Sequence, residues 1–590
     1  MTASTSRPAT RFVWLLLLIL LAALANVVAW WWPNRPVQVG HAPYAAQEHV
    51  VESMSFAPFR RGQSPLTKAY PTAEQVTEDL QSLKGITRGI RTYTSREGLE
   101  VVPPEAAKLG INVMQGIWLG PERAINDQEV AAAIELANKY PDAIKSLVVG
   151  NEVLLRKDLP VDELIGYIRK VKAAVKQPVT YADVWEFWLR FPQLLAEVDF
   201  ITVHFLPYWE DLPIAASHSM PHIMEVYREV KEKLPGKPIT IGEVGWPSEG
   251  RSRRDAIPSR TEAAGFIADF MQVAQREGLS YNLVEAFDQP WKVKLEGTVG
   301  GAWGVLNELR QPKFEVGGLV SNLPEWPLFA GLSVLMTLIL LVLHAQLVVR
   351  LSSGGMAAAV LFAQTQAALL AAAIEHALEY NFSLMHQAES GLAILLLAVF
   401  AMLLFRRLLA LLGNRVDLTH PPQKVSLMAL GSVFGLLRQV TGVLSLRSPR
   451  LGELIYGLLG LWVVYHAVML VAAGRYRDFP IDYFLAPIAG LLLLRLIAGL
   501  FGRNGNQGLA RIALANTFSD PQIHTAAQGR FGWEAVLAFL LLCLPVLVLR
   551  IETLSNREAL YWCAITVFYA LPLLGNLALA AQRSPQPMAA

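Results

Sequence analysis

The sequence predicts an α/β protein, a (β/α)8 TIM barrel followed by an all-α polytopic membrane domain. Short β-rich runs alternate with helical ones over residues 50–320, whereas long apolar runs alternate with short polar breaks over residues 327–581. Lysines are frequent up to Lys313, after which only Lys424 remains. Hydrophobic residues make up 53% of the chain and charged residues 17%, averages that conceal this division. One soluble domain and one membrane domain explain the pattern.

Charge and cysteine content narrow the choice of partners and cofactors. The net charge of +2 is too small to indicate a nucleic-acid partner. Cys543 and Cys563 both fall in predicted membrane spans, so the soluble part has no thiol for a disulfide or a metal site. The histidines show no metal-ligand spacing. We therefore expect neither a metal nor a cofactor.

The first apolar run, residues 12–32, predicts a transmembrane anchor. Its roughly 20 residues suffice to cross about 30 Å of hydrocarbon. Arg7 and Arg11 precede the run, which favours a cytoplasmic location for residues 1–11. A cleaved signal peptide is the alternative, but the run is long and no small-x-small cleavage site follows it closely. An uncleaved anchor places the following barrel outside the cytoplasmic membrane.

Seven further apolar runs predict the membrane domain, residues 327–581, which a tail at residues 582–590 follows. Residues 425–446 are ambiguous, because Arg438 falls in the middle of that apolar run. An amphipathic interfacial helix there obeys the positive-inside rule better than a span does, and gives eight spans with both termini in the cytoplasm. The seven runs are 327–349, 357–379, 390–412, 452–474, 481–501, 533–550 and 559–581.

The soluble part contains eight candidate strands with helical patterns between most of them. Eight strands with crossover helices in roughly 270 residues are typical of a TIM barrel. The expected strands are Met54–Phe59, Gly89–Tyr93, Asn112–Trp118, Ser146–Val149, Val179–Ala182, Phe200–Phe205, Pro238–Gly242 and Tyr281–Ala286. Expected helices include Ala73–Leu83, Asn126–Lys139, Val161–Lys176, Met220–Lys233 and Arg260–Glu277.

Two glutamates follow strands of this predicted barrel at the end where such folds carry their chemistry. Glu152 follows the fourth strand and Glu243 the seventh. Glu152 alone could be a surface carboxylate, but a second glutamate three strands later favours a pair that cleaves a glycosidic bond, one group protonating the leaving oxygen and the other attacking the sugar. Aromatic rings, which stack on sugars, follow other strands. The remaining strand-end candidates are Arg91, Tyr93, Trp118, His204, Tyr208, Glu285 and Trp291.

The segments around these glutamates resemble glycoside hydrolase family 17, the β-1,3-glucanases. Residues 240–248, TIGEVGWPS, resemble the family signature, and residues 149–152, VGNE, resemble its acid/base motif. Residues 285–292, EAFDQPWK, resemble the eighth-strand segment of microbial members. The resemblance covers residues 50–320. It implies a retaining mechanism with Glu152 as general acid/base and Glu243 as nucleophile.

The fusion of such a domain to several spans resembles bacterial membrane proteins of β-1,3/1,6-glucan synthesis. The membrane half shows no processive glycosyltransferase signature, and its polar insertion at residues 502–532 is too short for a nucleotide-sugar domain. Glucan remodelling is therefore expected in place of polymerisation. The resemblance implies a bacterial cytoplasmic membrane protein with an extracytoplasmic barrel. Its expected partners are a β-glucan, the lipid bilayer and a separate glucan synthase or export protein.

Six residues are predicted to bind substrate, Asn151 by holding the sugar 2-hydroxyl. The aromatic members could instead pack at the barrel mouth, and His204 could contact a sugar hydroxyl or be a core histidine. The expected reaction cleaves β-1,3-glucosidic bonds and transfers the glucosyl chain, including to β-1,6 positions. A hydrolytic endo-β-1,3-glucanase and a non-catalytic glucan-binding subunit are the alternatives. The six residues are Tyr93, Asn151, Tyr208, Trp246, Glu285 and Trp291.

Overall fold

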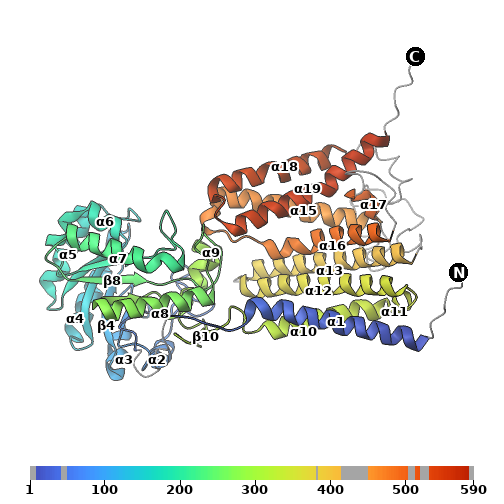
Figure 1. Ribbon diagram of the computed structural model, residues 1–590. Coiled ribbons are helices and arrows are strands. Elements are labelled where there is room, and N and C mark those ends of the chain that lie inside the picture. The colour runs from blue at the N-terminus through green and yellow to red at the C-terminus, as the bar shows by residue number, and fades with distance from the viewer. Residues whose placement is uncertain are drawn as a thin grey trace, which may run out of the picture. The chain divides into compact units, whose positions relative to one another are not determined.

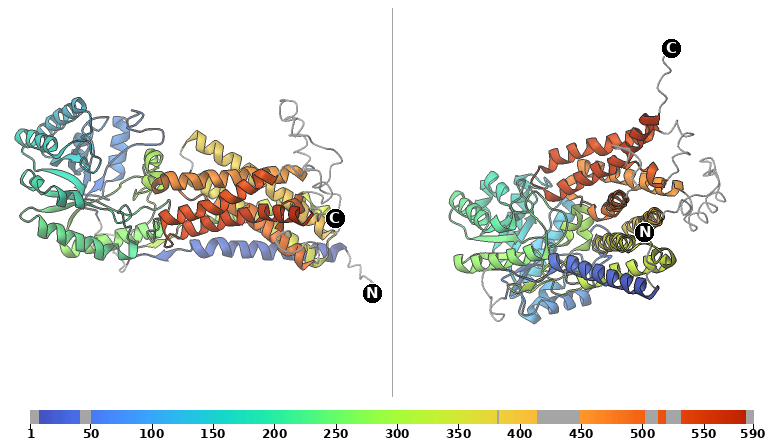
Figure 2. Two further views of the ribbon diagram at one scale, coloured as in Figure 1. Left: turned by 90° about the horizontal axis from the view of Figure 1, so that it is seen from above. Right: turned by 45° about the vertical axis from the view of Figure 1, so that its right-hand side comes forward.

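The computed structural model describes residues 8–40, 50–380, 383–413, 449–501, 512–518 and 531–583. They form two compact units (Figures 1 and 2). One unit comprises Pro36–Asn322 with the short segment Arg475–Asp478. The other comprises the N-terminal helix, Leu323–Gly474 and the chain from Phe479 onward.

The first unit is a closed barrel of parallel strands that follow one another in chain order from β2 to β9. The predicted TIM barrel is therefore confirmed. A small antiparallel pair, β1 (Val37–Gln38) with β10 (Leu319–Val320), joins the two ends of this unit. The barrel strands are β2 (Met54–Ser55), β3 (Gly89–Arg91), β4 (Asn112–Ile117), β5 (Ile144–Asn151), β6 (Val179–Val184), β7 (Ile201–Phe205), β8 (Ile239–Val244) and β9 (Ser280–Leu283).

Helices lie between the barrel strands, as the alternating pattern predicted. Thr72 begins the first of them with a capping box to Gln75, and Ser259 caps a later one, so these polar residues set the helix starts. Three helices were not among those predicted: α3, whose prolines interrupt the apolar period, α6, which is too short to show one, and α9, which Gly297 interrupts with a non-helical backbone. The helices are α2 (Ala73–Ser82), α3 (Val102–Leu109), α4 (Arg123–Lys139), α5 (Val161–Ala174), α6 (Trp185–Arg190), α7 (Ala216–Lys233), α8 (Arg260–Glu277) and α9 (Val293–Gly301).

The barrel strands are buried on both faces, which is why they read as nearly continuous apolar runs. In β5, for example, every residue except Lys145 is buried. The pairing register of three strand pairs shifts near the carboxyl ends, one of the shifts falling between Val203 and His204 and another between Val148 and Asn151. Such irregularities re-aim side chains at a barrel rim. They occur beside the residues predicted to be catalytic.

The second unit contains eight described helices that are long and apolar enough to cross a membrane. They lie side by side in Figures 1 and 2, with α12 contacting α1, α10, α13 and α16. Outward-facing leucines such as Leu20, 64% exposed, fit a lipid environment. The eight helices are α1 (Pro8–Asn34), α10 (Trp326–Leu343), α12 (Ser353–Tyr380), α13 (Leu384–Leu412), α15 (Pro449–Ala473), α16 (Ile481–Leu500), α18 (Phe531–Glu552) and α19 (Arg557–Arg583).

Each of the eight predicted apolar runs corresponds to one of these helices. The ambiguous segment 425–446 lies outside the described residues, as does most of the polar insertion at residues 502–532. Within that insertion the structure describes a short helix, α17 (Ala515–Phe518). Another short helix, α11 (Ala345–Val348), precedes α12.

Candidate active site

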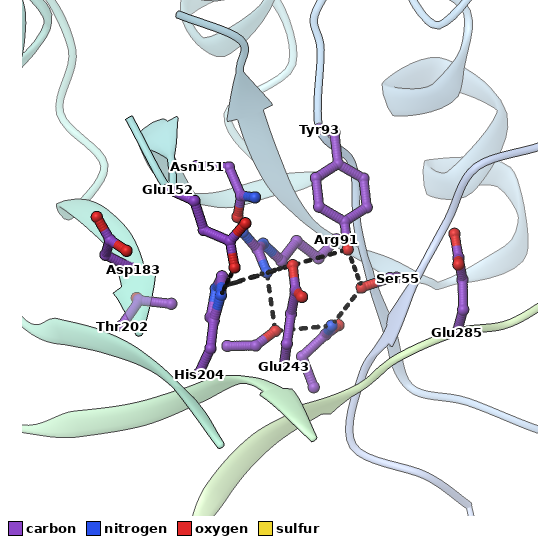
Figure 3. Close-up of polar contacts among 12 residues, drawn as sticks. Ser55, Arg91, Tyr93, Asn151, Glu152, Asp183, Thr202, His204, Glu243 and Glu285 are labelled. Atoms are coloured by element: carbon purple, nitrogen blue, oxygen red, sulfur yellow. Dashed lines mark hydrogen bonds and ion pairs between the residues drawn. The ribbon is translucent and has the colours of Figure 1, made fainter. Parts of the chain in front are cut away.

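The two predicted catalytic glutamates meet at the carboxyl ends of β5 and β8 (Figure 3). One carboxylate oxygen of Glu152 and one of Glu243 lie within 4.8 Å of each other. Retaining glycosidases hold their carboxyl groups about 5–5.5 Å apart, whereas inverting enzymes separate them by roughly 6.5–9.5 Å. The side chain of Glu152 is 24% exposed and that of Glu243 is 9% exposed. The geometry therefore fits a retaining pair with the more accessible Glu152 as the acid.

The backbone around Glu152 explains why a glycine precedes the Asn-Glu pair. Gly150 has a φ of +86°, and a Cβ there would lie 2.7 Å from a methyl group of Val153. Glu152 itself has a φ of 53°, an unfavourable conformation for a residue with a side chain. Its N–H donates to the carbonyl of Ala182 at 2.8 Å. The tight turn thus brings the Glu152 side chain back over the barrel end.

Glu243 is held by two donors that converge on one carboxylate oxygen. Arg91 Nη1 donates to Oε1 at 3.1 Å, and the Tyr93 hydroxyl donates to the same atom at 2.9 Å. Burial raises the pKa of Glu243, but electrostatic interactions with His204, Arg91 and Lys292 outweigh it and leave the pKa below its ordinary value. Glu243 therefore remains a carboxylate, the form that a nucleophile requires.

Arg91 also binds Asn151, the residue that precedes Glu152. Its Nη2 donates to Asn151 Oδ1, and Nη1 donates to the carbonyl of Gly242 at 2.8 Å. The arginine is 1% exposed. A single buried guanidinium, whose fork offers several donors, thus fixes Asn151 and Glu243 relative to each other.

A second layer behind Tyr93 was not predicted from the sequence. The Ser55 hydroxyl lies 3.0 Å from the Tyr93 oxygen and accepts a hydrogen bond from Asn282 Nδ2 at 2.8 Å. Burial and the charge of Glu243 hold the pKa of Tyr93 above its ordinary value, so the phenol keeps its proton. Polar residues inside buried strands, Ser55 in β2 and Asn282 in β9, were the available signal.

His204 lies between the two glutamates (Figure 3). Its Nδ1 is 3.1 Å from Glu152 Oε1, and its Nε2 is 3.8 Å from Glu243 Oε1. Arg91 Nη1 lies 3.5 Å from the same Nε2. The sequence left His204 as a sugar contact or a core histidine. The residue is 1% exposed, and both of its ring nitrogens face the two predicted catalytic carboxylates.

A further carboxyl group, Asp183, lies on β6 near Glu152. Burial and the charge of Glu152 raise the pKa of Asp183, whereas the hydrogen bond from the Tyr181 hydroxyl lowers it. The net result is a pKa of about 6. Asp183 was not among the predicted site residues, although its position directly after the fifth predicted strand, Val179–Ala182, was an available signal.

Glu152, His204 and Glu243 could by spacing alone reach one metal ion. The Arg91 guanidinium, 3.1 Å from Glu243, already supplies the positive charge that this carboxylate needs. A cation would have to approach against that guanidinium. The arrangement accordingly fits acid/base chemistry between carboxyl groups better than metal binding.

Two other predicted substrate residues, Glu285 and Trp291, follow β9 in the chain. Glu285 is buried and accepts from Lys292 Nζ at 2.8 Å through Oε2, while its Oε1 has no partner among the described residues. Burial raises the pKa of Glu285 to about 7, although Lys292 opposes this. Trp291 is half-buried, packs edge-on against Phe59 with ring centroids 5.8 Å apart, and donates its N–H to Gln289.

Tyr208 and Trp246, which were predicted to bind substrate, are both buried. The two side chains are 0% and 1% exposed, so neither ring has a face open to a sugar. Their polar atoms donate to the carbonyls of Arg251 and Ile257, at 2.8 Å and 3.0 Å. We therefore propose packing behind the site in place of substrate contact for both. Trp118, at the end of β4, is by contrast 41% exposed.

Residues 53–304 match the BtgE/BtgC glycoside hydrolase domain. The barrel is a glycoside hydrolase domain. The family resemblance predicted from the motifs around Glu152 and Glu243 is thereby confirmed for this part of the chain. The matched residues end before α10, so the match does not extend to the later membrane helices.

Several fungal proteins are similar to the glycoside hydrolase domain. A glucan 1,3-beta-glucosidase of Schizosaccharomyces pombe is 29% identical over 231 residues, covering 36% of this chain and 72% of that protein. A glucan 1,3-beta-glucosidase of Candida albicans is 27% identical over 260 residues, covering 40% and 84%. The crystal structure of a glycoside hydrolase family 17 beta-1,3-glucanosyltransferase from Rhizomucor miehei is 26% identical, with a TM-score of 0.40, and covers 45% of this chain and 95% of that one.

Proposed function

We propose that the chain is a membrane-anchored, retaining β-glucan-active enzyme that cleaves β-1,3-glucosidic bonds and transfers the glucosyl chain. The observation that carries this proposal is the pair Glu152 and Glu243, with oxygens within 4.8 Å, inside a glycoside hydrolase domain. The relatives named glucan 1,3-beta-glucosidases support the choice of substrate. Neighbouring polar side chains hold both glutamates in place, which favours an enzyme over a non-catalytic binding subunit.

In the first step Glu243 attacks the anomeric carbon while Glu152 protonates the leaving oxygen. The glycosidic bond breaks as the ester to Glu243 forms. Arg91 donates a hydrogen bond to the amide oxygen of Asn151. The N–H groups of Asn151 are therefore directed toward the sugar. Donation from Asn151 to the 2-hydroxyl would strengthen in the transition state and lower the barrier.

In the second step Glu152 takes the proton of an incoming hydroxyl, which attacks the glycosyl-enzyme and releases Glu243. Water gives hydrolysis and a sugar hydroxyl gives transfer. Attachment to a membrane that exports glucan would supply acceptors at high local concentration, which favours transfer. We include β-1,6 positions among the acceptors. Hydrolysis alone is the second candidate for the same site.

The full-length protein in nanodiscs should convert laminari-oligosaccharides into products longer than the donor. Mass spectrometry would detect the lengthened chains, and linkage-resolved NMR would identify the new bond. Release of short reducing sugars alone, even at high acceptor concentration, would show that the enzyme is a hydrolase and not a transferase. An absence of any product would reject the proposed function.

Trp291→Ala should weaken oligosaccharide use by about 1 kcal/mol, roughly fivefold in kcat/KM, because one stacking surface for a sugar ring is lost. Steady-state kinetics and thermal melting would check it. Trp246→Ala is the matched control, since removing that buried ring should chiefly lower the melting temperature. Unchanged kinetics in a folded Trp291→Ala protein would show that Trp291 packs against its neighbours and does not bind substrate.

Reporter fusions should place the barrel outside the cytoplasmic membrane. Arg11 in α1 and Arg350 between α10 and α12 favour cytoplasmic positions for those helix ends. Alkaline phosphatase fused after Gly318 should be active, whereas a fusion after Gly413, beyond α13, should be inactive. The reverse pattern would overturn this topology and the proposed extracytoplasmic location.

A further inference from the structure

His204 has a place in the site that the two-carboxylate mechanism leaves unused. The buried ring presents Nδ1 to Glu152 at 3.1 Å and Nε2 to Glu243 at 3.8 Å. Figure 3 draws the imidazole between the two side chains. A histidine that only filled core volume would not need a catalytic carboxylate beside each nitrogen.

A neutral imidazole carries one donor and one acceptor, so a ring that keeps its proton on Nε2, toward Glu243, can accept a further proton on Nδ1. While Glu152 is a carboxylic acid, Nδ1 can accept its O–H, and the ring proton on Nε2 then faces the Glu243 carboxylate. When that proton passes to Nδ1, the ring becomes an imidazolium that donates to the Glu152 carboxylate. The one acid/base proton can therefore lie on either atom, while the proton on Nε2 stays in place.

The charges beside the imidazole ring change during the reaction. Three carboxyl groups surround it, Glu152, Glu243 and Asp183, and Arg91 Nη1 lies 3.5 Å from Nε2. Formation of the glycosyl-enzyme turns Glu243 into a neutral ester, so its attraction for the proton shared by Glu152 and His204 is lost. The pair has by then given that proton to the leaving group, and it takes up another from the acceptor hydroxyl in the second step.

We propose that His204 is a positioning residue that shares the acid/base proton with Glu152. The inference rests on the proposed role of Glu152 as the acid/base. In glycosylation the proton passes from Glu152 to the glycosidic oxygen as that bond to the anomeric carbon breaks. In the second step the acceptor hydroxyl returns a proton to Glu152 as its oxygen bonds to the anomeric carbon and the Glu243 ester breaks. His204 exchanges protons only with Glu152, so it gains and loses none over a cycle.

The consequence for kinetics is specific. Two groups that share one proton retain it to a higher pH than the acid would alone. His204→Gln keeps an N–H donor but cannot carry the proton. We expect kcat/KM for laminari-oligosaccharides to fall on the order of tenfold, with the alkaline limb of its pH profile moved to lower pH by roughly half a unit or more. With a dinitrophenyl β-laminarioside, whose leaving group needs no proton, the glycosylation rate should stay within about twofold.

The experiment uses full-length protein in nanodiscs with both substrates across the pH range. His222→Gln is the matched control, because His222 is paired with Glu210 at 2.8 Å, away from the two catalytic glutamates. That variant should leave both profiles unchanged. An equal loss of rate on both substrates with an unmoved alkaline limb would show a structural role and overturn the proposal.

A spectroscopic measurement on the wild-type protein covers the case in which His204→Gln does not fold. The Nδ1 resonance of His204 should lie between those of a free and a protonated ring nitrogen, and it should shift when a 2-fluoro sugar traps the ester on Glu243, because the attraction of that carboxylate for the shared proton is then lost. Unchanged resonances would overturn the proposal. If the wild-type protein acts on neither substrate, the proposed function is rejected and this inference is rejected with it. If only Glu152→Ala and not His204→Gln selectively impairs the oligosaccharide, the function remains and only the inference is rejected.

Discussion

Glu243→Ala should abolish both transfer and hydrolysis, with kcat reduced roughly 10⁴-fold or more, as losses of a nucleophile do in other covalent enzymes. Without the carboxylate no glycosyl-enzyme can form, and the Arg91 and Tyr93 donors lose the oxygen on which they converge. The loss should be similar for laminari-oligosaccharides and for dinitrophenyl glycosides, because both need the attack on the anomeric carbon. Product formation per enzyme, followed over hours, would measure it.

The control for this variant is Glu135→Ala, which removes an exposed glutamate from α4. It should retain wild-type activity and melting temperature. A folded Glu243→Ala protein that keeps more than a few per cent of wild-type activity would mean that another group forms the covalent bond. The retaining assignment would then have to be made again, beginning with the neighbouring carboxyl groups.

Glu152→Ala should reduce action on laminari-oligosaccharides by about 10²–10⁴-fold, the usual contribution of general acid/base catalysis. Dinitrophenyl glycosides should still form the glycosyl-enzyme, because their leaving group departs without a proton. The step that fails is then the attack of water or sugar, which lacks its base. Azide needs no base, and the truncated side chain leaves it space at a position that is 24% exposed in the native protein.

Azide should therefore restore part of the turnover of Glu152→Ala and yield a glycosyl azide in the β configuration. Two inversions, one at Glu243 and one by azide, give net retention. If azide enters the Glu243→Ala site at all, it attacks directly and gives the α product, so the configuration reports which carboxylate was replaced. An α product from Glu152→Ala would mean that the mechanism is inverting, in conflict with the separation of the two glutamates.

The eight-stranded barrel and the two glutamates could be predicted because their signals are local. Strands and helices of different hydrophobic period alternate along the chain, and a carboxylate directly after a strand lies at the catalytic end of such a barrel. Glu152 and Glu243 both satisfy that rule within recognisable motifs. The membrane helices could be predicted equally well, since about 20 consecutive apolar residues are sufficient to identify a candidate span.

Other parts of the site depend on distances that the sequence does not contain. Tyr208 and Trp246 follow strands as Trp291 does, yet they are buried, because the covering loops carry the backbone carbonyls to which they donate. Asp183 follows a predicted strand directly, but the sequence does not show that its carboxyl group lies near Glu152. In each case the local pattern gave the residue's position along the chain but not what lies above it.

The sequence by itself determined the fold class, the glycoside hydrolase motif pair and the apolar runs of the membrane half. Only the tertiary structure decided that His204 lies between the glutamates and that Arg91 binds both Asn151 and Glu243. The physical reason is that strands from distant parts of the chain become neighbours when the barrel closes. Shifts in their register, such as the one between Val203 and His204, then set the directions in which side chains point.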